Sequence, residues 1–230
     1  MILFTRTAPG RPPRSAGLKV DEQGAVVGWQ SSGQRVGRFG RTLDDGERDA
    51  LVAALAAAAG APPGAAPEGA SGGGATEQVN AEGFGLSLGA GVEPPEPAAT
   101  LVRLLRDLHT DLLDHPVAAL ELDVSTGSPA TASLRHVGDQ AIVVRLVDVS
   151  VRTSNFDADS AIADQSTVGL GVSIEGPVEP GWTQSIDGLE IGEPIAGGFR
   201  TVKVDGASVD FEGDGAARPA ELAWMDGDDE

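Results

Sequence analysis

Hydrophobic and polar positions alternate in short segments at the start of the chain. A weak alternation over Met1–Thr7 predicts a strand, and the proline- and glycine-broken stretch Ala8–Gly17 predicts a loop. Leu18–Val20 and Ala25–Trp29, joined by a polar turn, predict a hairpin, and Arg35–Arg41 predicts a further short strand. The first quarter of the chain therefore predicts a small antiparallel sheet.

Two later segments have the apolar spacing of helices. Leu43–Ala59 follows a capping threonine, Thr42, and ends at a glycine. The second helix ends at Pro116, and one stripe of it carries Leu101, Leu105, Leu108 and Leu112. Between the helices, Ala61–Gln78 contains prolines, glycines and few large side chains, so we expect a mobile linker there. The alternation at Gly83–Leu88 predicts one more strand.

Beyond residue 116 the pattern changes to short strands separated by Gly, Pro, Asp and Ser, with no helical period. The predicted strands are Ala118–Val124, Ala130–Val137, Ala141–Val151, Val168–Ile174, Ser185–Ile191, Phe199–Val204, Ser208–Phe211 and Ala220–Met225. The spacing is typical of an antiparallel sandwich. We predict an α+β N-terminal domain, residues 1–116, with a short antiparallel sheet and two helices. An all-β, sandwich-like domain, residues 117–230, follows and ends in an acidic tail.

Composition excludes several classes of protein. The 230 residues contain no cysteine, which excludes disulfide scaffolds, cysteine–zinc sites and cysteine nucleophiles. The longest apolar run, Ala50–Ala59, is mostly alanine and falls short of the roughly 20 apolar residues of a membrane span. Met1–Arg6 has neither the basic start nor the apolar stretch of a secretory signal. We therefore expect a cytoplasmic protein.

Charge is distributed unevenly along the chain. The formal net charge is −19, yet residues 1–60 hold eight Lys and Arg against six Asp and Glu, a balance of +2. The remainder carries −21, and a surface of that kind repels nucleic acid and anionic lipid. We expect neither as a partner, and only the basic first quarter could contact phosphates.

The candidate partner-binding residues lie in the first loop. Arg11, Pro12, Pro13 and Arg14 combine two cations with two prolines, and proline lowers the entropy cost of ordering a loop on binding. The segment lacks the aromatic side chains on which a single-stranded nucleic acid would stack. We expect the loop Ala8–Arg14, or the turn of the hairpin, to contact another protein.

No catalytic, cofactor or metal site is predicted. His109, His115 and His136 lack the His-Glu-x-x-His spacing of a zinc helix. We expect His109 on the surface of a helix and His115 beside the negative helix end. His136 could act as a general base, but no serine in a Gly-x-Ser-x-Gly motif accompanies it. Gly69–Gly74 lacks the Lys-Ser/Thr of a phosphate-binding loop.

One acidic loop has part of a calcium-binding pattern. Asn155, Asp157 and Asp159 offer oxygen ligands at alternate positions, as a calcium loop does. Ser160 and Ser166 stand where the glycine and the bidentate glutamate of such a loop belong. We favour a solvated loop and keep a calcium site as the alternative.

About half of the chain is similar in pattern to a known protein family. The similarity rests on three segments, Met1–Thr7, Leu43–Leu55 and Glu93–Leu112. In order and pattern they resemble the emfourin family, small proteinaceous inhibitors of thermolysin-like metalloproteases. The chain departs from the family at the turn after the first strand, where a Ser-Gly-Gly-like sequence is replaced by residues 7–10, Thr-Ala-Pro-Gly, extended through Arg14. The resemblance implies protease inhibition and covers nothing after residue 116.

These observations predict a non-enzymatic protein-binding module, in its specific form an emfourin-like inhibitor of a metalloprotease. The alternative is an acidic immunity or assembly protein whose charge neutralises a basic protein partner. A strong loss of affinity between low and physiological salt would favour this alternative. An enzyme, which would need Asp, Glu, His136 and Arg residues to converge in a pocket, is the third hypothesis.

Overall fold

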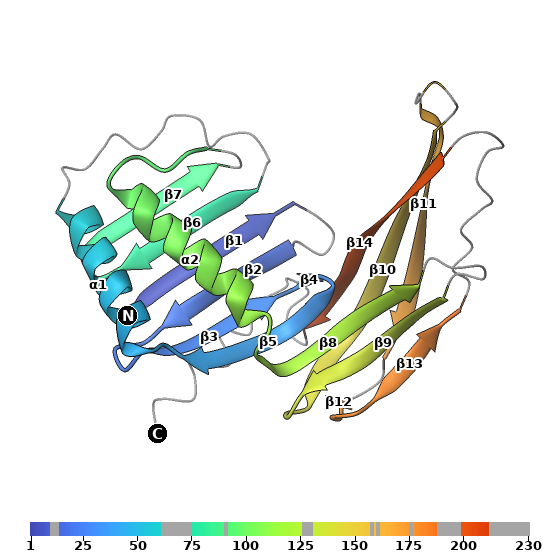
Figure 1. Ribbon diagram of the computed structural model, residues 1–230. Helices are drawn as coiled ribbons and strands as arrows, with labels where there is room; N and C mark the ends of the chain where they lie inside the picture. Colours follow the sequence, from blue (N-terminus) through green and yellow to red (C-terminus); the bar gives the residue numbers. More distant parts are fainter. Residues whose placement is uncertain are drawn as a thin grey trace.

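The computed structural model describes residues 1–9, 14–60, 75–89, 92–125, 131–156, 159, 162–174, 177–187 and 199–211. These residues form mostly β-structure, in two sheets, and their two helices lie on one face of the larger sheet (Figure 1). Neither of these two helices is long and apolar enough to cross a membrane.

The larger sheet has nine antiparallel strands in the order β13-β9-β8-β5-β3-β2-β1-β6-β7. Its strands are β1 (Ile2–Ala8), β2 (Arg14–Val20), β3 (Ala25–Gln30), β5 (Arg35–Thr42), β6 (Thr76–Ala81), β7 (Phe84–Gly89), β8 (Pro116–Ser125), β9 (Thr131–Gly138) and β13 (Thr183–Ile186). The first strand of the chain therefore lies inside the sheet, paired with β2 on one side and β6 on the other.

The smaller sheet has five strands and packs against the β8 and β9 end of the larger one (Figure 1). It contains β4 (Ser32–Gly33), β10 (Ile142–Phe156), β11 (Ile162–Ser173), β12 (Pro177–Val178) and β14 (Phe199–Phe211). The long strands β11, β10 and β14 pair in that order, β12 pairs with β10, and β14 also pairs with β4.

Two hydrophobic cores hold these layers together. The first lies between the larger sheet and the helices α1 (Asp45–Ala59) and α2 (Ala98–Leu112), where alternate strand residues such as Phe4 and Leu18 meet Leu101 and Leu105 of α2. The second packs β8 and β9 against the smaller sheet and includes Leu120, Leu134 and Val147. The alternation of the strands and the leucine stripe of α2 thus each bury one apolar face.

The predicted fold class, an α+β domain followed by a separate all-β sandwich, is wrong. The structure is mostly β, and a single nine-stranded sheet joins strands from both halves, because β8 pairs with β5 from Arg35↔Glu121 to Phe39↔Pro116. A second link joins β14 to β4 through Ser208↔Ser32. The alternation of apolar and polar residues correctly predicted most strands. It did not predict which strands pair when the paired residues are about 80 positions apart.

Several predicted boundaries also change. Residues 14–17, expected in a loop, begin β2, and residues 76–78, expected in the linker, begin β6. The two strands predicted over 199–211 form one strand, β14. The rest of the expected linker, residues 61–74, the predicted strand over 220–225 and the acidic tail lie outside the described residues.

Candidate functional site

The face of the larger sheet that carries the helices changes in polarity along β1 and β2. Ile2 and Phe4 of β1 are buried under the helices, but the next residue on that face is Arg6. Ala16 pairs with Arg6, and Arg14 pairs with Ala8, so these residues share the same face one step further along. In Figure 1 these ends of β1 and β2 extend beyond α2. The polar end of the face is therefore left uncovered by the helix.

A cavity of about 550 Å³ lies at this uncovered end, and we call it the arginine cavity. Its described lining includes Arg6 of β1, Arg14 of β2, Glu77 of β6 and Arg106 of α2. The other described lining residues are uncharged, so the cavity carries a formal charge of +2. It is a concentration of cations in a protein of net charge −19.

Glu77 holds two of the three arginines in place. The Arg6 Nε donates a hydrogen bond to Glu77 Oε1 at 2.6 Å, and the Arg106 Nη2 and Nε donate to Glu77 Oε2 at 2.5 and 3.1 Å. The Glu77 side chain is 13% exposed. Burial alone would raise the pKa of Glu77, but the hydrogen bonds and charges of Arg106 and Arg6 outweigh it and lower that pKa. The carboxylate therefore stays ionised and fixes both guanidinium groups.

Several guanidinium N–H groups of the cavity have no hydrogen-bond partner among the described residues. Arg6 uses only its Nε on Glu77, and its guanidinium carbon lies 5.9 Å from the centre of the Phe4 ring, which further positions it. Arg106 likewise keeps one terminal nitrogen without a hydrogen bond among the described residues. The exposed Arg14 side chain has no ion-pair partner in the described part of the chain.

The start of β2 is anchored from the opposite face of the sheet. Trp29 is 1% exposed, and its indole Nε1 donates to Ser15 Oγ at 3.0 Å. The Ser15 N–H in turn donates to Ser31 Oγ at 2.7 Å. A Cβ on Gly17 would lie 2.5 Å from Trp29 Cζ2, so only glycine leaves room for the indole here. These contacts fix the strand that carries Arg14.

The predicted partner-binding residues relate to this cavity in different ways. Arg14 lines it, as does Ala8 at the end of β1, so the two ends of the predicted contact loop border the cavity. Arg11, Pro12 and Pro13 lie outside the described residues.

Sequence reasoning missed the other charged residues of the arginine cavity. Arg6, Glu77 and Arg106 come from β1, β6 and α2, and no motif joins them. One signal was present in β1, where the apolar alternation of Ile2 and Phe4 is broken by an arginine at the next inward position. Glu77 lay within the predicted linker, which concealed its role.

A second concave surface, the helix groove, lies between the helices. The groove has a volume of about 550 Å³, and its lining includes the half-buried Leu104 and Leu108. Its carboxylates are Asp44, Glu47, Asp107 and Asp111. Arg41 is the one cation among its described lining residues. The groove thus combines an apolar floor with an acidic rim.

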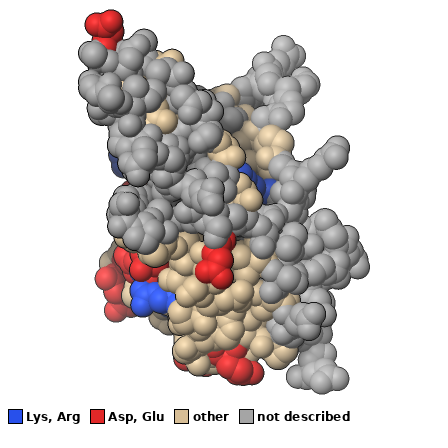
Figure 2. Space-filling model, turned by 90° about the vertical axis from the view of Figure 1, so that its right-hand side faces the viewer, with Lys and Arg blue, Asp and Glu red and all other residues tan. Residues whose placement is uncertain are grey.

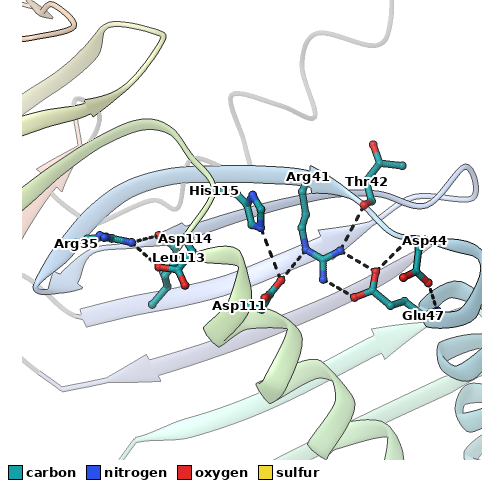
Figure 3. Close-up of polar contacts among 9 residues, drawn as sticks. All are labelled: Arg35, Arg41, Thr42, Asp44, Glu47, Asp111, Leu113, Asp114 and His115. Carbon is teal, nitrogen blue, oxygen red and sulfur yellow. Dashed lines mark hydrogen bonds and ion pairs between the residues drawn. The ribbon is translucent and has the colours of Figure 1, made fainter.

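Arg41 of β5 forms ion pairs with one carboxylate on each helix (Figure 3). Its Nη1 and Nη2 donate to the two Glu47 oxygens at 2.7 and 2.6 Å, and its Nε lies 2.8 Å from Asp111 Oδ2. Glu47 also completes a capping box, in which it accepts from the Asp44 N–H at 2.9 Å while Asp44 Oδ1 accepts from the Glu47 N–H at 2.8 Å. Hydrogen bonds from Arg41 and then from the Asp44 backbone lower the pKa of Glu47 to about 2. The cap of α1 is therefore Asp44, and the prediction of Thr42 was wrong.

The histidines are distributed as follows. His109, expected on a helix surface, is 4% exposed, with its Nε2 3.4 Å from the Trp29 carbonyl oxygen, and burial lowers its pKa. His115 follows the end of α2, as predicted, with its Nε2 4.0 Å from Asp111 Oδ2 (Figure 3). His136 of β9 is 6% exposed, and neither ring nitrogen has a hydrogen-bond partner among the described residues.

The partial calcium pattern lies at the turn between β10 and β11. Asn155 is 8% exposed and pairs with Asp164 in the sheet, so it is not part of a solvated loop. Asp157 lies outside the described residues. In the part of the chain that the structure describes, no group of three His, Asp or Glu side chains could hold a metal ion.

The charge of one other face is visible in Figure 2. In this view from the right-hand side of Figure 1, the described side chains are mainly neutral, with a few separate acidic and basic groups among them.

Comparison with protein-family models, curated proteins and solved structures finds no match to this chain.

Proposed function

We propose that the chain is a non-enzymatic protein-binding module whose contact surface is the open end of β1 and β2. The arginine cavity carries this proposal. It borders both ends of the loop that sequence reasoning selected for partner contact, and it presents guanidinium groups held by Glu77. A surface held in place before binding loses little entropy when a partner binds, which favours affinity.

The specific form of this proposal is inhibition of a thermolysin-like metalloprotease, as the emfourin resemblance implies. The loop between Ala8 and Arg14 would enter or cover the protease cleft, and the sheet would supply the rigid support. The cytoplasmic location expected from the sequence remains a prediction alongside it.

The test combines the purified full chain with a thermolysin-like protease and measures both residual peptide hydrolysis and co-elution. We expect inhibition and a stable complex, with inhibition weakened roughly fivefold by Arg14→Gln, the effect of removing one charged contact. Arg103→Gln, on an exposed position of α2 outside the cavity, is the matched control and should inhibit like the wild type. If the protease is neither inhibited nor bound, the inhibitor form of the proposal is wrong.

The helix groove favours the second candidate function, an acidic immunity or assembly protein with a basic partner. Its acidic rim and apolar floor of Leu104 and Leu108 suit a basic segment with an apolar anchor. Binding of such a partner should weaken strongly between low and physiological salt. Asp107→Asn, which changes an exposed rim residue, should weaken it as well, whereas a partner held at the β1 and β2 end would be unaffected.

A further inference from the structure

We propose that the arginine cavity binds the side-chain carboxylates of an acidic segment of a partner protein. This inference rests on the proposed binding role of the β1 and β2 end, and it adds the chemistry of the group recognised there.

The charge of the cavity favours an anion. Arg6, Arg14 and Arg106 outnumber Glu77 among its charged lining residues. Because Glu77 neutralises one of the three cations, two positive charges remain for a ligand. Arg6 and Arg106 are 44% and 37% exposed, so their remaining N–H groups are open to solvent.

The geometry favours carboxylates in particular. A guanidinium presents its N–H groups in a planar fork that matches the two oxygens of a carboxylate. Within the cavity this pairing already exists, since the Glu77 carboxylate joins Arg6 and Arg106 from β6. A carboxylate of the partner could lie between Arg14 and the terminal nitrogens of Arg6, which have no hydrogen-bond partner among the described residues, with β1 and β2 holding both arginines on one face.

The charge of the whole chain limits the size of the anion. A net charge of −19 repels a polyphosphate backbone at long range, and this penalty grows with the number of charges on the ligand. An acidic peptide segment with one or two carboxylates matches the cavity charge of +2 and avoids most of that repulsion. We therefore infer a protein segment and not a nucleic acid as the ligand.

Fluorescence anisotropy on the full chain can test this inference. The probe is a zwitterionic-dye-labelled, amidated peptide Gly-Glu-Gly-Glu-Gly at low salt, and the comparison peptides replace both Glu with Gln or with phosphoserine. We expect the Glu peptide to bind and the Gln peptide to bind at least tenfold more weakly. Arg14→Gln should weaken binding of the Glu peptide roughly fivefold, whereas Arg103→Gln should leave it unchanged.

Three outcomes would overturn the inference. These are equal affinity for the Glu and Gln peptides, equal losses from Arg14→Gln and Arg103→Gln, or at least tenfold tighter binding of the phosphoserine peptide. Failure here is distinguishable from failure of the proposed function. Protease inhibition that survives alongside any of these outcomes would leave the binding role intact and remove only the carboxylate assignment. Specific peptide binding without protease inhibition would remove only the inhibitor role.

Discussion

Replacing Glu47 with glutamine should destabilise the fold in a pH-dependent way. Glu47→Gln keeps the shape of the side chain but removes the charge that pairs with both terminal nitrogens of Arg41 and weakens the capping box at Asp44. Because α1, α2 and β5 meet at Arg41, the loss affects contacts between elements as well as one helix end.

The size of the loss follows from the pKa of Glu47. Its fall from 4.5 to about 2 corresponds to about 3 kcal/mol without screening. The carboxylate is 39% exposed, so solvent screening reduces the contribution to about 1–2 kcal/mol at neutral pH. Since the pKa is lowered in the folded state, this stability is present above pH 4.5 and is lost as the pH falls toward 2.

Urea denaturation between pH 7 and pH 3 measures the effect. The difference in unfolding free energy between the wild type and Glu47→Gln should be largest at neutral pH and should shrink below pH 4.5. Asp49→Asn makes the same chemical change on an exposed position of α1 and should alter stability by less than about 0.5 kcal/mol. A difference that does not change with pH, or an equal loss from Asp49→Asn, would refute the reasoning.

Three further predictions concern buried positions. Gly17→Ala should cost about 1–3 kcal/mol because its Cβ would collide with the Phe4 carbonyl oxygen and would lie 2.5 Å from the Trp29 ring. Gly85→Ala, with nothing within 4 Å of its Cβ, should change urea stability little, and equal losses would contradict the packing argument. His136→Leu should raise the unfolding free energy by about 1 kcal/mol, since it removes buried nitrogens that lack partners among the described residues, and a decrease would contradict this. Burial lowers the pKa of His109, so stability should fall as the pH drops below 6.5, and this slope should be smaller in His109→Gln.

Much of the local structure was predictable from the sequence, but the fold class was not. The leucine stripe ending at Leu112 predicted α2 because its period is a local property of the chain. The pairing of β5 with β8 depends instead on a close approach between distant residues. Gly37, at φ +140°, leaves no room for a Cβ beside Ala118 and Ala119, and nothing in the local pattern predicted that contact.

The candidate site was predictable only in part. Arg14 stood out because it ends a loop rich in arginine and proline. Arg6, Glu77 and Arg106 meet it only after β1, β2, β6 and α2 have assembled, and pairing of Arg6 with Glu77 spans 71 positions. The spacing of residues along the sequence does not predict a contact between such distant positions, so the cavity could be recognised only from the folded arrangement of the strands and α2.

The most direct test of the arginine cavity is an NMR titration that follows the side-chain Nε–Hε signals of the full chain. Unlabelled Gly-Glu-Gly-Glu-Gly is added at low salt, and the signals are assigned through single Arg→Gln variants. We predict saturable shifts concentrated on Arg6, Arg14 and Arg106, with Arg48 and Arg103 unmoved. Shifts of similar size on all exposed arginines, or none on the three cavity arginines, would contradict the account.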